Sequence, residues 1–362
     1  VSESDREIRK WLENKCKDFE ESNYEVANMW REHLGISKKT IDVSVSPNGS
    51  KSQMPHACFE NKPSGFKSML DFIKTHQNGI KKNNCFFCME HTGVYTFLLC
   101  NFLQKHGLAY TLVSPHHLSK SLGLRRGKND KADSKDITRY AYLFREELKP
   151  SVLISDTLLT IKSLLGLRRR LVNAKKGLTT AANELRQFAK PAIYKPLVEQ
   201  SNKLIRQNEK AIEVVENKIK KLIEKEQELQ RLFDLVTSVK GVGFVIAAHL
   251  LVYTNQFKGF ENAKQFACYI GVAPFEKSSG TSVYVPAKVS HMAHKKLKGV
   301  ISNGASIAIL YDKELKAFYD RKIKEGKNKH VVRNAVTNKL IHRVFAVVKR
   351  GSKFIDLFRH KA

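Results

Sequence analysis

The stretch Cys85-Phe86-Phe87-Cys88-Met89-Glu90 is the part of the sequence that decides the fold class. Its apolar run, followed by a helical pattern at about residues 94–106, is typical of a buried strand in an α/β sheet. A carboxylate directly after such a strand is energetically costly unless the protein uses it. The stretch therefore predicts a buried strand with a candidate functional acid, Glu90, at its end.

The sequence on either side predicts a mixed sheet flanked by helices. Strands are predicted at 40–45, 57–59 and 110–113, and helices from residue 63 onward, at 94–106 and at 131–144. Strands first, and then strands alternating with helices, indicate an α/β domain over residues 34–150. Residues 1–33 are polar and of mixed charge, and they predict an atypical helical extension before this domain.

The middle of the chain, residues 151–234, predicts two long helices. Apolar residues step by three and four over 164–188, and a second seam runs over 205–233. Such seams fit a helical hairpin within one subunit and a coiled coil between subunits equally well. Polar Asn208 and Glu226 on the second seam favour a register-setting role.

The last third predicts a mainly α-helical domain over 235–350, followed by a basic tail at 351–362. The segment Lys240-Gly241-Val242-Gly243 lies between two apolar helical patterns, which indicates a helix-hairpin-helix. Glycines in such a turn let backbone amides approach a phosphate at the start of the second helix. Lys240, Gly241 and Gly243 are therefore candidate nucleic-acid contacts.

The positive net charge of the chain predicts a polyanionic partner. Among 362 residues, 64 Lys and Arg stand against 35 Asp and Glu, a net charge of +29. The charge is spread over several segments, which favours a nucleic acid with a long footprint over a membrane surface. No apolar run reaches the ~18–20 residues of a membrane span, and no signal peptide is apparent, so we expect a cytoplasmic protein. Further candidate nucleic-acid contacts are Arg125, Arg126, Lys128, Lys288, Lys295 and Lys296.

Two more carboxylates could join Glu90. Asp130 and Asp133 are three residues apart on one face of a predicted helix, within a basic stretch at 125–133. Carboxylates that converge from separate elements among cations are what divalent-metal phosphodiester chemistry needs. In the alternative, Asp130 caps its helix and Asp133 pairs with a neighbouring cation.

Ser279 is the candidate nucleophile. It precedes Gly280 in a segment, 269–282, that predicts a polar loop before a strand at 283–285. A serine beside a glycine on a loop can present its hydroxyl to a phosphate, with Lys288 and the following cations stabilising the developing charge. The same composition is also ordinary for a loop.

Four motifs in order resemble the DEDD-type insertion-sequence transposases, to which the pilin-gene invertases are related. They are Met89-Glu90-His91-Thr92-Gly93-Val94-Tyr95, Lys128-Asn129-Asp130-Lys131-Ala132-Asp133, Gly241-Val242-Gly243, and Gly271-Val272-Ala273-Pro274 followed by Ser279-Gly280. The resemblance implies a RuvC-like (RNase H fold) N-terminal domain, a coiled-coil middle, and a C-terminal transposase domain with helix-hairpin-helix and catalytic serine. It also implies that Glu90, Asp130 and Asp133 bind Mg²⁺ and that Ser279 is the nucleophile.

For function, the resemblance implies a DNA transposase or recombinase of a mobile element that acts through a covalent serine–DNA intermediate. It implies a homo-oligomer, a dimer or tetramer joined through the coiled coil, with a composite site between subunits. It further implies guidance by a structured RNA and a bacterial cytoplasmic protein that is nucleoid-associated when bound.

The sequence departs from the family pattern at the first acid. The family reads Gly-Ile-Asp-Val-Ser-Lys, whereas Gly35-Ile36 here runs directly into Ser37-Lys38. Asp42 matches a later aspartate of the segment, and it is the residue that could substitute as a metal ligand. The departure leaves two alternatives: an impaired copy that only binds nucleic acid, and a RuvC-type metal-dependent nuclease that does not need the serine. A second departure is His291-Met292-Ala293-His294, where relatives carry a Lys/Arg-Gly-Asn turn.

Overall fold

A computed structural model describes residues 30–46, 54–76, 85–91, 93–122, 130–151, 154–279, 283–290 and 293–356. The chain divides into two compact units, Val1–Leu153 and Ile154–Ala362. Most of the predicted extension at 1–33 lies outside the described residues. Its last residues belong to a strand that begins at Trp30, before the domain boundary predicted at residue 34.

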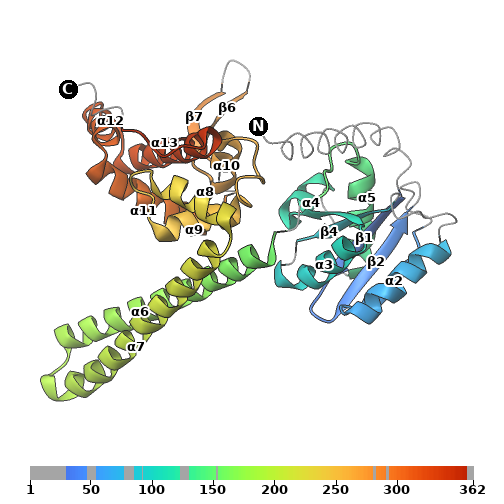
Figure 1. Cartoon of the computed structure of the whole chain (residues 1–362), viewed down its shortest axis with the longest axis horizontal. Helices are drawn as coiled ribbons and strands as arrows, with labels where there is room; N and C mark the ends of the chain where they lie inside the picture. Colours follow the sequence, from blue (N-terminus) through green and yellow to red (C-terminus); the bar gives the residue numbers. More distant parts are fainter. Residues whose placement is uncertain are drawn as a thin grey trace. The chain divides into compact units, whose positions relative to one another are not determined.

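The first unit is built on a five-stranded mixed sheet (Figure 1). Its strands are β1 (Trp30–Ile36), β2 (Thr40–Ser46), β3 (His56–Glu60), β4 (Cys85–Glu90) and β5 (Ala109–Val113), in the order β3-β2-β1-β4-β5. β1, β2 and β3 pair antiparallel, and β4 runs parallel to both β1 and β5. The strand that the apolar run at 85–89 predicts is confirmed, and it lies next to the end of the sheet.

Helices cover both faces of this sheet. On one face, α2 (Pro63–His76) and α3 (Phe97–Lys105), which follows the short 3₁₀ helix η4 (Gly93–Thr96), pack on the alternate residues Ile41, Val43 and Val45 of β2. On the other face, α4 (Pro115–Ser121) and α5 (Asp130–Leu143) form a second cluster with Cys88 and Val113. Because successive side chains of a strand point to opposite faces, alternate strand residues face α2 and α3, and the residues between them face α5.

The sequence missed β1 and α4. β1 carries Arg31, Glu32 and His33, so it reads as part of a polar helix. In the sheet it lies between β2 and β4, and backbone pairing on both sides outweighs its local composition.

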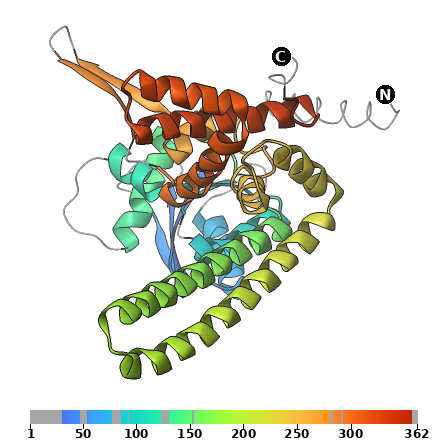
Figure 2. The same ribbon diagram turned by 90° about the vertical axis from the view of Figure 1, so that its left-hand side faces the viewer.

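The second unit consists of a long helical pair and a helical core (Figures 1 and 2). The pair is α6 (Asp156–Phe188) and α7 (Pro191–Glu224). The core contains α8 (Gln227–Thr237), α9 (Phe244–Tyr253), α10 (Ala263–Ile270), α11 (Lys295–Tyr311), α12 (Lys313–Lys324) and α13 (Lys329–Arg350). No helix in the described ranges is both long and apolar enough to cross a membrane.

The helical pair packs within one chain. Ile161 and Leu165 of α6 share a buried cluster with Val215 and Ile219 of α7. Arg168 Nε donates to Glu216 Oε1 across the pair at 2.6 Å. The predicted second seam does not continue to Phe233, because α7 ends at Glu224 and Glu226 has extended backbone at the start of α8. Asn208 Nδ2 donates to the Leu204 carbonyl of its own helix at 3.1 Å.

The segment around Ser279 is a strand rather than the predicted loop. β6 (Pro274–Ser279) pairs antiparallel with β7 (Val283–Val289), and Figure 2 shows this hairpin projecting from the helical core. The serines and glycine of the segment are typical of a loop, but the longer apolar partner strand supplies the pairing that makes it extended.

Candidate active site

The candidate acids of the first unit lie on the α5 face of the sheet. Glu90, the last residue of β4, alternates with Cys88 and therefore points to the same face. Asp42 shares the phase of Ser44, whose Oγ lies 2.7 Å from Ser134 Oγ on α5. Asp133 is half-buried on α5 itself. The structure thus brings Glu90, Asp42 and Asp133 to one side of the sheet, from three separate elements.

The strand register places Asp42 and Glu90 at one level. Asp42 is opposite Gly35 of β1, and Leu34 is beside Met89 of β4. One further step along the two parallel strands puts Gly35 beside Glu90, so the two acids are two strand spacings apart, about 10 Å. Because glycine has no side chain, β1 contributes nothing to the face between them.

Asp42 is engaged within the sheet. His56 Nε2 lies 3.0 Å from Asp42 Oδ1, and Cys58 Sγ donates to Asp42 Oδ2 at 3.9 Å. Only 12% of the Asp42 side chain and 14% of the His56 side chain is exposed. The carboxylate therefore has partners on β3, a cross-strand interaction that the sequence did not predict.

A tight turn occupies the place where the family's first acid would follow Ile36. Ser37 N–H donates to the Thr40 carbonyl at 2.8 Å, and Ser37 Oγ accepts from Thr40 N–H at 3.0 Å. Asn61 Nδ2 donates to the Ser37 carbonyl at 2.9 Å and fixes this turn against β3. The hydroxyl of Ser37 thus takes part in a hydrogen bond within the turn.

The other predicted metal and phosphate contacts of this unit are described only in part. α5 begins at Asp130, whose side chain is not described, and Arg125, Arg126 and Lys128 lie outside the described residues. Over the part of the chain that the structure describes, no three His, Cys, Asp or Glu side chains lie close enough to hold a metal ion. Asp130, one of the three predicted ligands, is outside that search because its side chain is not described.

In the second unit, Ser279 is the last residue of β6 and pairs with Val283. Its side chain is not described, and neither is that of Lys288, which pairs through its backbone with Phe275. Lys295 and Lys296 are exposed on the first turn of α11. The serine therefore stands at the end of a strand, directly before the connection to β7.

The root of this hairpin, Gly271-Val272-Ala273-Pro274, is anchored by two other helices. Lys298 Nζ of α11 donates to the Gly271 carbonyl at 2.7 Å, and Asn334 Nδ2 of α13 donates to the Val272 carbonyl at 2.9 Å. Gly271 has φ +73°, and a Cβ there would lie 2.3 Å from Ala293 Cβ. Burial lowers the pKa of Lys298. Sequence reasoning missed Asn334, for which no local signal exists.

The two glycines of the predicted hairpin at 240–243 differ in how closely other residues pack against them. Gly241 has φ +92°, and a Cβ there would lie 2.5 Å from the Gly304 carbonyl oxygen of α11. Gly243 caps α9, and an added Cβ would meet nothing within 4 Å. Lys240 Nζ forms an ion pair with Asp356 at 2.5 Å. Close packing against α11 thus explains why residue 241 is a glycine. At Gly243 there is free space around the first backbone amides of α9.

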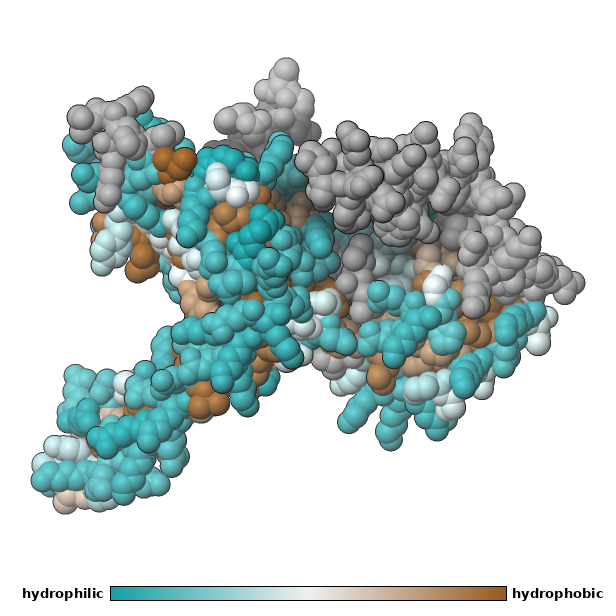
Figure 3. Space-filling model, viewed as in Figure 1, coloured by the Kyte–Doolittle hydropathy of each residue, from teal (hydrophilic) through white to brown (hydrophobic). Residues whose placement is uncertain are grey.

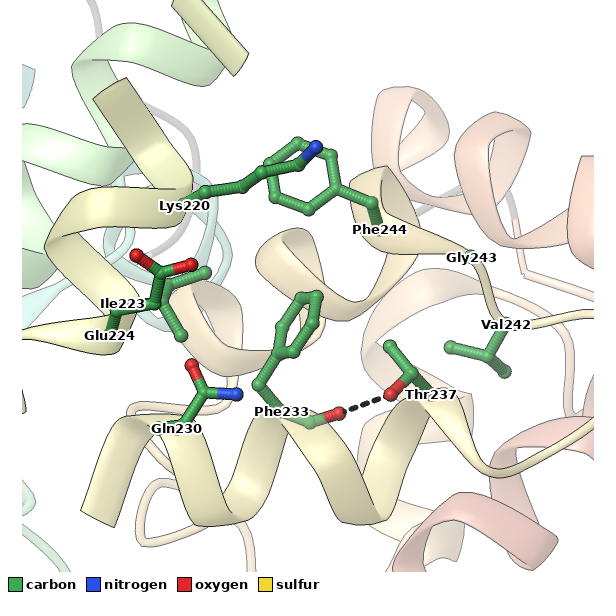
Figure 4. Close-up of a pocket in the computed structure, with 9 residues that line it drawn as sticks. All are labelled: Lys220, Ile223, Glu224, Gln230, Phe233, Thr237, Val242, Gly243 and Phe244. Carbon is green, nitrogen blue, oxygen red and sulfur yellow. Dashed lines mark hydrogen bonds between the residues drawn. The ribbon is translucent and has the colours of Figure 1, made fainter. Parts of the chain in front are cut away.

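A pocket of about 320 Å³ adjoins this open helix start (Figure 4). Lys220 of α7, Phe233 of α8 and Gly243 line it, and Lys220 Nζ lies 5.4 Å from the centroid of the Phe244 ring. The sequence did not single out Lys220, because it is one of several lysines on a charged helix.

Comparison with known proteins matches the sequence of this chain to a class, the transposases. Residues 34–191 match a transposase model of the DEDD type from the IS110 group, and residues 233–320 match the model of the Transposase IS116/IS110/IS902 family. The chain belongs to this family of insertion-sequence transposases.

Three relatives show the extent of the similarity. The pilin gene-inverting proteins of Moraxella bovis and Moraxella lacunata are each 26% identical over 331 residues, which span 89% of this chain and 96% of theirs. An uncharacterized 43.6 kDa protein of insertion element IS110 from Streptomyces coelicolor is 30% identical over 125 residues, 34% of this chain and 31% of its own length.

Proposed function

We propose that this transposase cleaves and rejoins DNA through a covalent bond to Ser279. The observation that carries the proposal is the anchored root of the β6–β7 hairpin. Hydrogen bonds from Lys298 and Asn334 hold the two residues Gly271 and Val272, close before the strand that ends in Ser279. A nucleophile gains most from being held in one orientation toward its target, and a strand fixed at its root provides that.

The proposed step is a transesterification. Ser279 Oγ attacks a DNA phosphorus and forms one phosphorus–oxygen bond, while the bond from phosphorus to the leaving strand's oxygen breaks. The serine loses its proton and the departing oxygen gains one. The number of phosphoester bonds stays constant, so the reverse attack by another strand end completes the exchange without an external energy source.

We further propose roles for the acids and partners. Glu90, Asp130 and Asp133 are the residues that would bind Mg²⁺, and DNA ends with a structured guide RNA would occupy the basic surface. The name of the Moraxella relatives, pilin gene-inverting proteins, supports an action on DNA. A dimer or tetramer would form through α6 and α7. Their exposed apolar side chains are Leu167, Phe188, Ile193, Leu197, Leu204 and Val214, and Figure 3 shows apolar patches on the otherwise hydrophilic face of this pair that is in view.

The test is adduct formation on DNA that carries the element ends, with the element's RNA present. Ser279→Ala removes the nucleophile, and Ser278→Ala, one residue earlier in the same strand, is the matched control. We expect a protein–DNA band in denaturing gels for the unsubstituted protein and for Ser278→Ala, and none for Ser279→Ala. Equal adducts from all three proteins would disprove the assignment.

A second candidate function is nucleic-acid binding without cleavage. It is favoured by the turn at Ser37, which stands where the first acid is expected, and by the partners of Asp42 on β3. In that case the protein binds its DNA and RNA, but no variant forms adducts. A third outcome, strand cleavage that survives Ser279→Ala, would instead identify a metal-dependent nuclease.

A further inference from the structure

A row of five aromatic rings crosses the second unit near the root of the hairpin. The rings belong to α9, α10, the start of α11 and the α9–α10 connection. Neighbouring centroids lie 6.1 Å apart for His249 and Tyr253, 4.8 Å for Tyr253 and His294, 5.7 Å for His294 and Tyr269, and 5.4 Å for Tyr269 and Phe260. We call these residues the aromatic row.

Tyr269 makes the row accessible from solvent. It is 40% exposed, although its ring contacts both Phe260 and His294. His294 is fixed as well, because its Nδ1 accepts from Leu297 N–H at 3.1 Å and caps α11. A ring that is supported by its neighbours and open to solvent can accept another flat ring without reordering.

Cations border the row without acidic partners. Lys162 Nζ of α6 lies 5.8 Å from the Tyr253 centroid, and Arg169, seven residues along α6, is exposed. No carboxylate in the described ranges forms an ion pair with Lys162, Arg169 or Lys296. Lys296 stands two residues after His294 at the start of α11, and Arg169 lies about two helical turns from Lys162 on α6. Burial, and then the charges of Lys162, Lys296 and Arg169, lower the pKa of His294.

We propose that the aromatic row binds an unpaired nucleotide, with its base stacked on Tyr269 and its phosphates held by Lys162, Arg169 and Lys296. Aromatic faces interleaved with cations recognise single-stranded nucleic acid, because every base has a flat face and every phosphate a charge. A duplex hides its base faces, so it would meet only the cations. The proposal rests on the proposed function only in taking a nucleic acid as the partner.

The first test measures affinity for single strands with the full chain. Labelled twelve-nucleotide RNA and DNA strands, and a DNA duplex of that length, are titrated at fixed salt. Tyr269→Ala should weaken binding of the single strands about 5- to 100-fold, Tyr269→Phe should leave it nearly unchanged, and duplex binding should change little. Tyr311→Ala, at a tyrosine that is 70% exposed outside the row, is the matched control.

The second test observes stacking in the unsubstituted protein and does not depend on a variant that folds. A strand with 2-aminopurine at single positions should lose fluorescence on binding at one position, and Tyr269→Ala should restore it. Arg169→Gln should lower the slope of affinity against salt by about one. The RNA and DNA arms show which strand the site takes.

Equal losses for Tyr269→Ala and Tyr311→Ala, or no fluorescence change at any position, would overturn the aromatic-row proposal. Ser279→Ala should bind single strands like the unsubstituted protein. The outcome is therefore separate from that of the proposed function, because binding needs no nucleophile and adduct formation on element ends is measured independently.

Discussion

The two units differ in how completely each one holds its own candidate residues in place. In the second unit, side chains from α11 and α13 hold the root of the serine hairpin, and Gly271 fits only because it lacks a side chain. In the first unit, Glu90 and Asp42 share a sheet face, but a glycine lies between them and Asp42 is bound to His56. The comparison teaches that a sheet can keep its pairing whichever side chain follows Ile36, because backbone hydrogen bonds do not depend on that side chain.

The largest effect, on strand transfer, should come from inserting the aspartate that the family pattern has after Gly35-Ile36. Inserting Asp-Val between Ile36 and Ser37 adds two residues, so it keeps the alternation of β1 and places a carboxylate on the α5 face. If the unsubstituted chain is limited by this acid, Mg²⁺-dependent strand transfer should rise by ~10³-fold or more. Inserting Asn-Val is the control. If the Asp-Val variant folds but strand transfer does not increase, the first unit does not lack an acid.

The next largest effect should distinguish the two glycines at the start of α9. Gly241→Ala places a Cβ against the Gly304 carbonyl at a positive φ and should lower the free energy of unfolding by about 2–4 kcal/mol. Gly243→Ala, with open space, should cost less than about 1 kcal/mol. Chemical denaturation measures both. Similar values for the two variants would contradict the packing role of Gly241.

A smaller effect should appear at the Asp42–His56 pair. In a double-mutant cycle with Asp42→Asn and His56→Gln, the coupling free energy should be about 1 kcal/mol, since the pair is largely buried and hydrogen-bonded. Denaturation curves without metal measure it. A coupling near zero, together with loss of Mg²⁺-dependent activity in Asp42→Asn alone, would show that Asp42 serves as a metal ligand instead.

The smallest effect should be a pH dependence in the aromatic row. Burial, first, and nearby cations lower the pKa of His249 and His294 below the ordinary value near 6.5. The unfolded chain then binds more protons just below that pH, so stability is full above it and falls as the pH decreases. His294→Asn, which can still cap α11, should make this fall in stability less steep.

Denaturation midpoints measured between about pH 7.5 and 5.5 test the predicted fall in stability. His330→Asn, at an exposed position, is the control. An unchanged slope in His294→Asn would exclude the histidine as its source.

Sequence reasoning predicted the parts that depend on local pattern. The run at 85–89 and the stepped apolar residues at 164–188 were sufficient for β4 and α6, because burial repeats with a fixed period in each element. β1 was missed, since its pairing partners β2 and β4 make it a strand. The end of α7 at Glu224 was missed too, because the apolar period continues across the break.

The site was predictable only as a list of residue types. Glu90 stands on the face that alternation implies, and Asp133 lies on the helix that covers this face. The partnership of Asp42 with His56 depends on which residue of β3 faces which residue of β2. The contact of Asn334 with Val272 joins residues far apart in the sequence, and no spacing predicts it.

The most direct test of the account is to identify the residue that becomes linked to DNA. Adducts formed on element ends are digested with nuclease and protease, and the nucleotide-bearing peptide is sequenced by mass spectrometry. The account predicts a single modified residue, Ser279, at the end of β6. Modification of any other residue, or efficient strand exchange with no nucleotide-bearing peptide, would contradict it.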